Sequence, residues 1–174
     1  MKIYIVRHGQ TDWNVEGRYA GRIDIPLNSK GIKQAKETKE KLKNIKFDKV
    51  FSSPLLRAYE TAKIIYDGEI IKDERIIERG NGDLEGKLKS EIKEKIDFNN
   101  PNKTEYNIES IISVRKRIKD FLDDITTNYK NKNILVVMHA GIGIYARCYF
   151  EGEPKNNDYD SYKIKNCEIK EYEV

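Results

Sequence analysis

The only two histidines of this 174-residue chain stand where folding could bring them to one place. His8 follows a short β-branched run at residues 2–6, and His139 follows the aliphatic run Asn133–Met138. Both runs predict strands, and ligands of open α/β sheets bind beyond the carboxyl ends of the strands. Either histidine alone is better explained as a surface residue or a hydrogen-bonded core residue. Together, and with the arginines described next, they indicate a functional site.

Two arginines place positive charge near the same predicted edge. Arg7 immediately precedes the first histidine, and Arg57 lies one turn into a helix that we expect Ser53 and Pro54 to open, with Ser53 as its cap. Helix N-termini bind anions through free N–H groups, and arginine grips phosphate through two parallel donors. The strand end, the glycine turn and the helix start therefore predict one shared phosphate site. The competing interpretation of Arg57 is a surface salt bridge with Glu60.

One acidic residue and one loop extend the candidate site. Glu78 follows an expected strand at residues 76–77 and opens a glycine-punctuated loop, where its carboxyl group could act as a general acid. On spacing alone, a surface glutamate is the simpler interpretation. Arg18 and Arg22 bracket Gly21 in a loop that faces either the site or solvent.

Other phosphate chemistries lack their sequence signatures. The chain has no GxxxxGK[ST] segment, so no P-loop is expected, and neither Cys148 nor Cys167 is followed by arginine at the spacing of a thiol-phosphate loop. No cluster of acidic residues suggests a two-metal site, and the cysteines and histidines lack zinc-ligand spacing. What remains is nucleophilic catalysis by neutral histidine, with no metal and no cofactor.

The composition is that of a globular protein and excludes several classes. Hydrophobic residues make up 38% and charged residues 36%, and the apolar residues gather in clusters, which excludes disorder. Lys+Arg total 33 against 29 Asp+Glu, a net charge of +4 that is too small to predict a nucleic-acid partner.

The longest aliphatic run is far too short to span a membrane. Two cysteines without CxxC spacing indicate a reduced, cytoplasmic protein. The sequence carries no signal for an oligomeric state.

Strands and helices alternate along the chain, which predicts a single α/β domain over residues 1–174 with a mostly parallel sheet. The expected strands are residues 2–6, 49–52, the extended pairs 70–71 and 76–77, residues 133–138 and a final segment at 162–174. Three helices start at Asn28 or Ser29, at Ser53 and near Gly141. The apolar stripes that define helices are Ile32, Ala35, Leu42 and Ile45 in one, and Ile108, Ile111, Ile112, Ile118, Phe121, Leu122 and Ile125 in another.

The chain resembles the histidine phosphatase superfamily, the phosphoglycerate mutase-like proteins. RHGQT at residues 7–11 is similar to the family's RHG[EQ]T signature, and further motifs follow in the family's order up to about residue 150. These motifs are TxxN at 11–14, G..D.PL...G at 21–31, SSxLxRAxxTA at 52–62, ExxxGxxEG at 78–86, ESxxxVxxR at 109–117 and VxH[GA]G at 136–141, with a weak match, NCEI, at 166–169. The resemblance implies a three-layer sandwich with helices on both faces of the sheet.

The resemblance also implies a mechanism. His8 would attack phosphorus in line and form a phosphohistidine, while Arg7, Arg57 and His139 would neutralise the charge on the equatorial oxygens. Glu78 would protonate the leaving oxygen and then help to activate water. Because Glu78 must be protonated while His8 is neutral, this predicts a bell-shaped rate profile with an optimum on the acid side of neutral. The residues that the resemblance assigns to substrate binding are Asn14, Thr11, Gly21, Ala140, Gly141 and Arg79.

The sequence departs from the mutase branch of the family. Only 60 residues separate Glu78 from His139, where mutases carry a longer insertion with a paired arginine, and residues 98–109 hold only Lys103 as a cation. Gly141 stands where mutases usually have asparagine, and Asn81 stands where an aromatic residue is usual in both branches. The pair Glu78-Arg79, in contrast, resembles the mutases. A phosphatase need only admit water to its phosphoenzyme, so less cover over the site favours hydrolysis.

We therefore expect a metal-independent phosphomonoester phosphatase that acts on a small phosphorylated metabolite. The alternatives are a phosphoglycerate mutase, a ribazole-phosphate phosphatase of cobalamin synthesis, and a binding domain without catalytic activity. The complete set of catalytic residues argues against the last. The leaving group would be recognised by the loops after Gly80 and around residues 99–107. These loops contain no motif that identifies a substrate.

Overall fold

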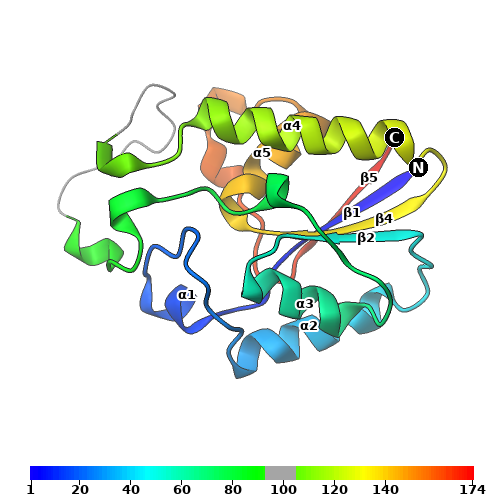
Figure 1. Cartoon of the computed structure of the whole chain (residues 1–174), viewed down its shortest axis with the longest axis horizontal. Helices are drawn as coiled ribbons and strands as arrows, with labels where there is room; N and C mark the ends of the chain where they lie inside the picture. Colours follow the sequence, from blue (N-terminus) through cyan, green and yellow to red (C-terminus); the bar gives the residue numbers. More distant parts are fainter. Residues whose placement is uncertain (93–104) are drawn as a thin grey trace.

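Five strands form one sheet in the computed structural model, which describes residues 1–92 and 105–174. The spatial order is β3-β2-β4-β1-β5, so β4 lies at the centre with β1 beside it (Figure 1). The strands are β1 (Lys2–Arg7), β2 (Lys49–Ser52), β3 (Ile71–Lys72), β4 (Asn133–Met138) and β5 (Ile169–Glu173). The first four run parallel, and β5 pairs antiparallel with β1 at the edge. The α/β fold with a mostly parallel sheet is confirmed.

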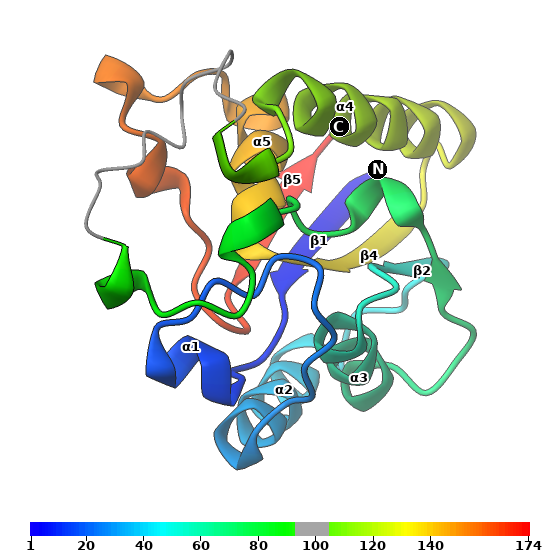
Figure 2. The same ribbon diagram turned by 60° about the vertical axis from the view of Figure 1, so that its left-hand side comes forward.

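Helices cover both faces of this sheet, as the two views in Figures 1 and 2 show. The long helices are α2 (Ser29–Leu42) and α3 (Leu56–Ile65) on one face, and α4 (Ile111–Asn128) and α5 (Ala140–Glu151) on the other. Successive side chains of a strand point to opposite faces, so Ile134 and Val136 pack in the core with α4 and α5, whereas Leu135 and Val137 pack with α2 and α3. Burial on both faces explains why β4 is apolar throughout.

Shorter helices lie in the connections. They are α1 (Asp12–Glu16) and the 3-10 helices η1 (Glu74–Ile76), η2 (Gly82–Leu84), η3 (Lys89–Glu91), η4 (Glu105–Asn107), η5 (Lys155–Asn157) and η6 (Tyr159–Tyr162). In Figure 1 the amino ends of the parallel strands lie on the right, near both chain termini, and α1 lies at the opposite end. In the part of the chain that the structure describes, no helix combines the length and apolarity needed to cross a membrane.

The parallel register of β1 and β4 sets the position of both histidines. Arg7 is paired with Met138, so the next residues, His8 and His139, leave the sheet at the same level. The His8 N–H also donates to the Met138 carbonyl, 3.0 Å away, which continues the ladder by one bond. Two residues 131 positions apart in the chain therefore meet because their strands are neighbours in one sheet.

The expected start of α3 is wrong. The helix begins at Leu56, and its N-cap Leu55 contributes no capping side chain. The Ser53 N–H instead prolongs the sheet by donating to the Val137 carbonyl at 3.0 Å. Asp24, which lies on a distant loop, supplies the cap, because its Oδ1 accepts from the Leu56 N–H at 2.7 Å. The Ser53 hydroxyl is thereby left for another partner.

The expected strand at residues 76–77 is also wrong. Ile76 ends the 3-10 helix η1, which Asp73 caps by accepting from the Arg75 N–H at 2.8 Å. Its buried side chain joins the core without joining the sheet, which shows that an apolar β-branched pair does not by itself define a strand. Glu78 therefore follows an extended segment outside the sheet.

The remaining differences concern which apolar residues are buried. Ile32 on α2 is 39% exposed and Ile112 on α4 is 63% exposed, although each belonged to an expected apolar stripe. Ile45 lies beyond the end of α2. Of the final segment 162–174, only residues 169–173 form a strand. The other expected strands and the helices beginning at Ser29 and Ala140 are confirmed within one or two residues.

Candidate active site

A cavity of about 840 Å³ opens at the carboxyl edge of the parallel strands. Its lining includes Arg7, His8, Asn14, Gly21, Arg57, Glu78, Arg79, Ala140 and Gly141 from the expected site, together with Arg18, Tyr19, Ala20, Asn81, Lys89, Ile144, Tyr145, Asp160 and Lys163. The site has two regions. The inner end consists of Arg7, His8, Arg57 and His139, and the mouth consists of Arg18, Lys89, Asp160 and Lys163.

His8 is held with one ring nitrogen free to react. Its side chain is buried, and its Nδ1 lies 2.7 Å from the Gly9 carbonyl oxygen. A carbonyl can only accept, so Nδ1 carries the hydrogen and Nε2 of the neutral ring keeps a lone pair. Burial, with the charges of Arg57 and Arg7 nearby, holds the pKa of His8 well below its usual 6.5. The ring is therefore neutral at physiological pH, as a nucleophile must be.

Close backbone packing fixes the turn after this histidine. A Cβ atom at Gly9 would lie 2.6 Å from the Gly31 carbonyl oxygen, so the turn and the first residues of α2 can approach only because both positions are glycine. The Gly9 N–H donates to the Thr61 hydroxyl of α3 at 3.0 Å. These contacts anchor the His8 backbone to two helices.

His139 lies beside His8 at the base of the site. The two ring centroids are 5.1 Å apart, and the His139 ring is fully buried, behind the residues that line the cavity. Its Nε2 lies 2.7 Å from the Ser53 hydroxyl, whereas its Nδ1 has no hydrogen-bond partner. Burial, followed by the charges of Arg57, His8 and Arg7, lowers the pKa of His139 well below 6.5, so this ring is neutral as well.

Backbone carbonyls orient the two arginines of the inner end. Arg57 is buried and donates through both Nη atoms, to the Ile23 carbonyl at 2.9 Å and to the Gly21 carbonyl at 2.7 Å. The Arg7 Nη1 donates to the Ile164 carbonyl at 2.9 Å. The expected alternative for Arg57, a surface salt bridge, is wrong.

Three buried polar atoms of the described residues have no hydrogen-bond partner, and all three belong to the inner end. They are Arg7 Nε, Arg57 Nε and His139 Nδ1. The two arginine Nε–H groups can only donate, and buried donors without protein partners are costly and rare, so their clustering here fits the binding of a group that accepts hydrogen bonds. Desolvation lowers the pKa of both arginines, but a guanidinium remains charged in proteins. An anion bound at the inner end would accept from both guanidinium groups.

Glu78 is clamped at the N-terminus of α5. Its Oε1 accepts from the Arg79 N–H at 2.9 Å and from the Ile142 N–H at 3.0 Å, and its Oε2 accepts from the Gly141 N–H at 3.1 Å. A Cβ atom at Gly141 would lie 2.7 Å from Oε1, so a larger residue would displace the carboxyl group. Glycine at position 141 thus has a physical role in placing Glu78.

An ion pair behind Glu78 escaped the sequence reasoning. Arg117 donates to the carbonyls of Arg75, Ile77 and Glu78 at 2.8, 2.6 and 3.3 Å, and it pairs with both carboxylate oxygens of Glu109. Glu109 in turn accepts from the Gly80 N–H at 3.1 Å. This pair fixes the backbone on both sides of the clamped glutamate. Both residues belong to the ESxxxVxxR match, but the sequence alone assigns them no role.

The expected binding residues divide into two groups. Asn14, Gly21, Arg79, Ala140 and Gly141 line the cavity, whereas Thr11 does not, because its hydroxyl caps α1 by accepting from the Asn14 N–H. The Asn14 Oδ1 accepts from the Thr11 N–H and from the Asn166 Nδ2 at 3.3 Å, which leaves the Asn14 amide N–H groups for a ligand.

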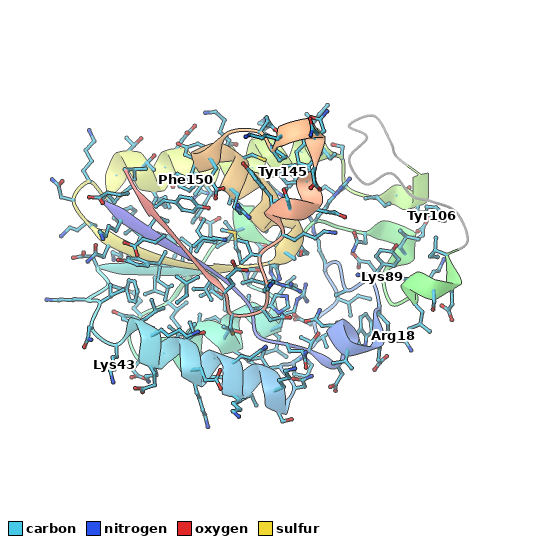
Figure 3. All side chains as sticks on the ribbon, turned by 180° about the vertical axis from the view of Figure 1, so that it is seen from behind. Arg18, Lys43, Lys89, Tyr106, Tyr145 and Phe150 are labelled. Atoms are coloured by element: carbon cyan, nitrogen blue, oxygen red, sulfur yellow. The ribbon has the colours of Figure 1, made fainter. Side chains whose placement is uncertain are left out.

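Besides Arg18, the mouth contains two lysines that the sequence did not single out. Lys89 and Lys163 both line the cavity, and desolvation with the charges of Lys163 and Arg7 lowers the pKa of Lys89. Lys163 pairs with Asp160 at 2.7 Å. Figure 3 shows Lys89 and Arg18 toward one end of the molecule and Lys43 at the other.

Two expected features of this region lie elsewhere. Arg22 lies outside the cavity lining and donates to the Glu78 carbonyl and to Glu109. Lys103 and the loop residues 99–104 lie outside the described residues.

Among the residues that are described, no three His, Cys, Asp or Glu side chains gather as a metal-binding group.

Comparisons with known proteins agree with this architecture. The family model of the histidine phosphatase superfamily (branch 1) matches residues 3–174. Phosphoserine phosphatase 1 of Hydrogenobacter thermophilus is 39% identical over 150 residues, which cover 80% of this chain and 71% of that protein.

Two solved structures share the fold over nearly the whole chain. Bacillus stearothermophilus YhfR has a TM-score of 0.88 at 28% identity and covers 99% of this chain and 91% of its own. A mutant phosphoserine phosphatase from Entamoeba histolytica, in complex with phosphoserine, has a TM-score of 0.84 at 30% identity and covers 98% and 89%.

Proposed function

Since this chain belongs to branch 1 of the histidine phosphatase superfamily and is a phosphatase of that type, we propose that it hydrolyses a small phosphorylated metabolite, without a metal, through a phosphohistidine at His8. The observation that carries the proposal is the cluster of three buried nitrogens without protein partners at the inner end, on Arg7, Arg57 and His139. A phosphoryl group offers the oxygens that these atoms lack.

In the first step, the Nε2 lone pair of His8 attacks phosphorus and the ester P–O bond breaks. The guanidinium groups of Arg7 and Arg57 stabilise the charge on the equatorial oxygens, and Asn14 donates its amide N–H to the same group. The low pKa of His8 keeps its lone pair available below pH 6.5, which supports activity on the acid side of neutral.

Glu78 supplies the proton that the leaving oxygen requires. After that transfer the carboxylate accepts from the Arg79 N–H and from two N–H groups at the N-terminus of α5, which stabilise its negative charge. Water then attacks the phosphohistidine, and Glu78 takes one of its protons. The N–P bond breaks, phosphate is released and His8 is neutral again.

The mouth favours substrates whose leaving group is also anionic. Lys89 and Lys163 face the cavity with Asp160 as the only acid of the lining apart from Glu78 in the described part of the chain. A phosphomonoester that carries a carboxylate or a second phosphate fits this charge. The phosphoserine bound to the E. histolytica relative has such a carboxylate.

Product analysis separates the phosphatase from the mutase alternative. The protein is incubated with 3-phosphoglycerate and a trace of 2,3-bisphosphoglycerate, and in parallel with phosphoserine, α-ribazole phosphate and p-nitrophenyl phosphate. We expect release of inorganic phosphate. Efficient conversion to 2-phosphoglycerate with little free phosphate would instead establish a mutase. No turnover of any substrate, with wild type and His8→Ala alike, would favour a binding domain.

A further inference from the structure

Ser53 stands at the junction of β2 and α3 and contacts the second histidine. Its side chain is fully buried, and its Oγ lies 2.7 Å from the His139 Nε2. The sequence had assigned this hydroxyl to a helix cap, but Asp24 performs that task. The contact with His139 therefore needs its own explanation.

The direction of this hydrogen bond follows from the other partners of the hydroxyl. Oγ accepts from the Leu55 N–H at 3.4 Å, which occupies one of its lone pairs. In the described chain the hydroxyl hydrogen has one acceptor within reach, the His139 Nε2. Within the protein each tautomer leaves one buried hydrogen without an acceptor, either the Nδ1 hydrogen or the hydroxyl hydrogen. The His139 ring lies beside His8 at the base of the cavity, where water or an anion can accept from Nδ1, whereas nothing there could accept from the hydroxyl. The hydroxyl therefore donates, and Nε2 accepts.

We propose that Ser53 is a positioning residue that holds neutral His139 in the tautomer with hydrogen on Nδ1, so that this ring donates a hydrogen bond to the phosphoryl group. The role in catalysis rests on the proposed function, whereas the tautomer is a property of the protein alone. With hydrogen on Nε2, a bare Nδ1 lone pair would face the phosphoryl oxygens and repel them. A hydroxyl one residue past the end of β2 thus decides whether His139 attracts or repels the substrate.

The burial of His139 makes the tautomer matter. Because its pKa lies well below 6.5, the ring carries one hydrogen at neutral pH, and the position of that hydrogen determines which nitrogen donates. The unpartnered Nδ1 is then an unused donor, as are the Nε atoms of Arg7 and Arg57. His8 is held in the same tautomer by a different device, its bond to the Gly9 carbonyl.

Nitrogen-15 NMR of the histidine rings tests this directly. The chain has two histidines, so ¹⁵N-histidine labelling gives four ring signals, and a His8→Ala variant assigns them. In the ligand-free wild type at pH 7.5 we expect His139 to show a protonated Nδ1 and an unprotonated Nε2. The reverse pattern would overturn the inference, whatever activity the protein has, and a missing phosphatase activity would leave this spectrum unchanged.

Variants then test the role of the hydroxyl. Ser53→Ala should move His139 toward the Nε2-protonated tautomer and reduce kcat/KM by about 100-fold, a loss typical of one misplaced transition-state donor. Ser53→Thr keeps the hydroxyl and should restore both the spectrum and most of the activity. Ser52→Ala is the matched control, because Ser52 is equally buried but its hydroxyl donates to the Ser53 carbonyl.

Two results would contradict the proposal. One is a Ser53→Ala variant that keeps the wild-type tautomer. The other is a Ser52→Ala variant that loses as much activity as Ser53→Ala, because a general packing defect would then explain both losses. If Ser53→Ala fails to fold, the wild-type and Ser53→Thr spectra still decide the question.

Discussion

The inner end and the mouth of the cavity are built in different ways. At the inner end, Arg7, His8 and His139 follow directly from two neighbouring strands, and backbone carbonyls orient His8 and both arginines. The mouth is made of 3-10 turns and irregular connections whose charged side chains are exposed, such as Lys89 and Lys163. The inner end is thus fixed by the fold, whereas the mouth depends on side chains of surface connections.

This difference assigns the chemical step to the inner end and the choice of substrate to the mouth. Buried groups with backbone partners keep one geometry and can stabilise a transition state without reorganising. Exposed charges contribute modestly to binding and are screened by salt. Variants of the inner end should therefore change kcat, and variants of the mouth should change KM.

The largest effect is expected from His8→Ala. Loss of the nucleophile should reduce kcat by about 10⁴-fold or more, because the covalent route through the enzyme disappears. Release of p-nitrophenol from its phosphate measures this loss, and circular dichroism verifies that the variant is folded. A folded variant that retains more than a tenth of the wild-type rate would show that the inner end does not carry the chemistry.

Glu78→Gln should have the next largest effect, and its size should depend on the substrate. General acid catalysis contributes about 10²–10⁴-fold when the leaving oxygen is a poor leaving group. We therefore expect a loss of about 100-fold or more with an alkyl phosphate such as phosphoserine and a much smaller loss with p-nitrophenyl phosphate. Equal losses with both substrates would indicate that the clamp at α5 serves stability alone.

Lys89→Met tests the mouth. Removing this cation should raise KM about 5- to 10-fold for substrates with an anionic leaving group and leave kcat nearly unchanged. The effect should shrink at high salt and be absent with p-nitrophenyl phosphate. Lys43→Met, at the opposite end of the molecule, is the control (Figure 3). A large fall in kcat for Lys89→Met would remove the distinction between the two regions.

The smallest expected effect is a pH dependence of the free energy of unfolding. It distinguishes the two regions because it arises from the histidines of the inner end and not from the mouth. The pKa values of His8 and His139 are low in the folded protein, so below pH 6.5 the unfolded chain binds protons that the folded chain does not. The free energy of unfolding should fall as pH falls, by about 1.4 kcal/mol in total for each histidine between pH 7.5 and 5.5, because the unfolded histidines become protonated over this range.

Urea denaturation between pH 7.5 and 5.5 measures this dependence. The His139→Gln variant should lose about half of the slope, because one titrating ring remains. Lys89→Met should keep the wild-type slope. A free energy of unfolding that stays constant over this range would mean that the two rings are not buried as neutral groups.

The same contrast explains what the sequence could predict. Strand ends are readable from apolar runs, so Arg7, His8 and His139 were found from position alone. Arg57 was placed near the site, although the helix start beside it was wrong, because the capping residue Asp24 comes from a loop 32 positions away. Local signals cannot reveal a cap that only the tertiary fold supplies.

The residues that sequence reasoning missed depend on long-range contacts. Arg117 acts through carbonyls about 40 positions away, and Ser53 acts through a histidine 86 positions away. Lys89 and Lys163 meet at the mouth only because irregular connections bring them there. None of these pairings has a periodic pattern, and the charges resemble any solvated surface.

The central claim, that His8 carries the phosphoryl group, is tested most directly by trapping the intermediate. Wild-type protein is mixed with ³²P-labelled substrate, quenched in alkali within milliseconds, digested and mapped by mass spectrometry. We predict a label that is stable in alkali, labile in acid and attached to His8, and no label in His8→Ala. A stable label on any other residue, or equal labelling of the His8→Ala variant, would contradict the account.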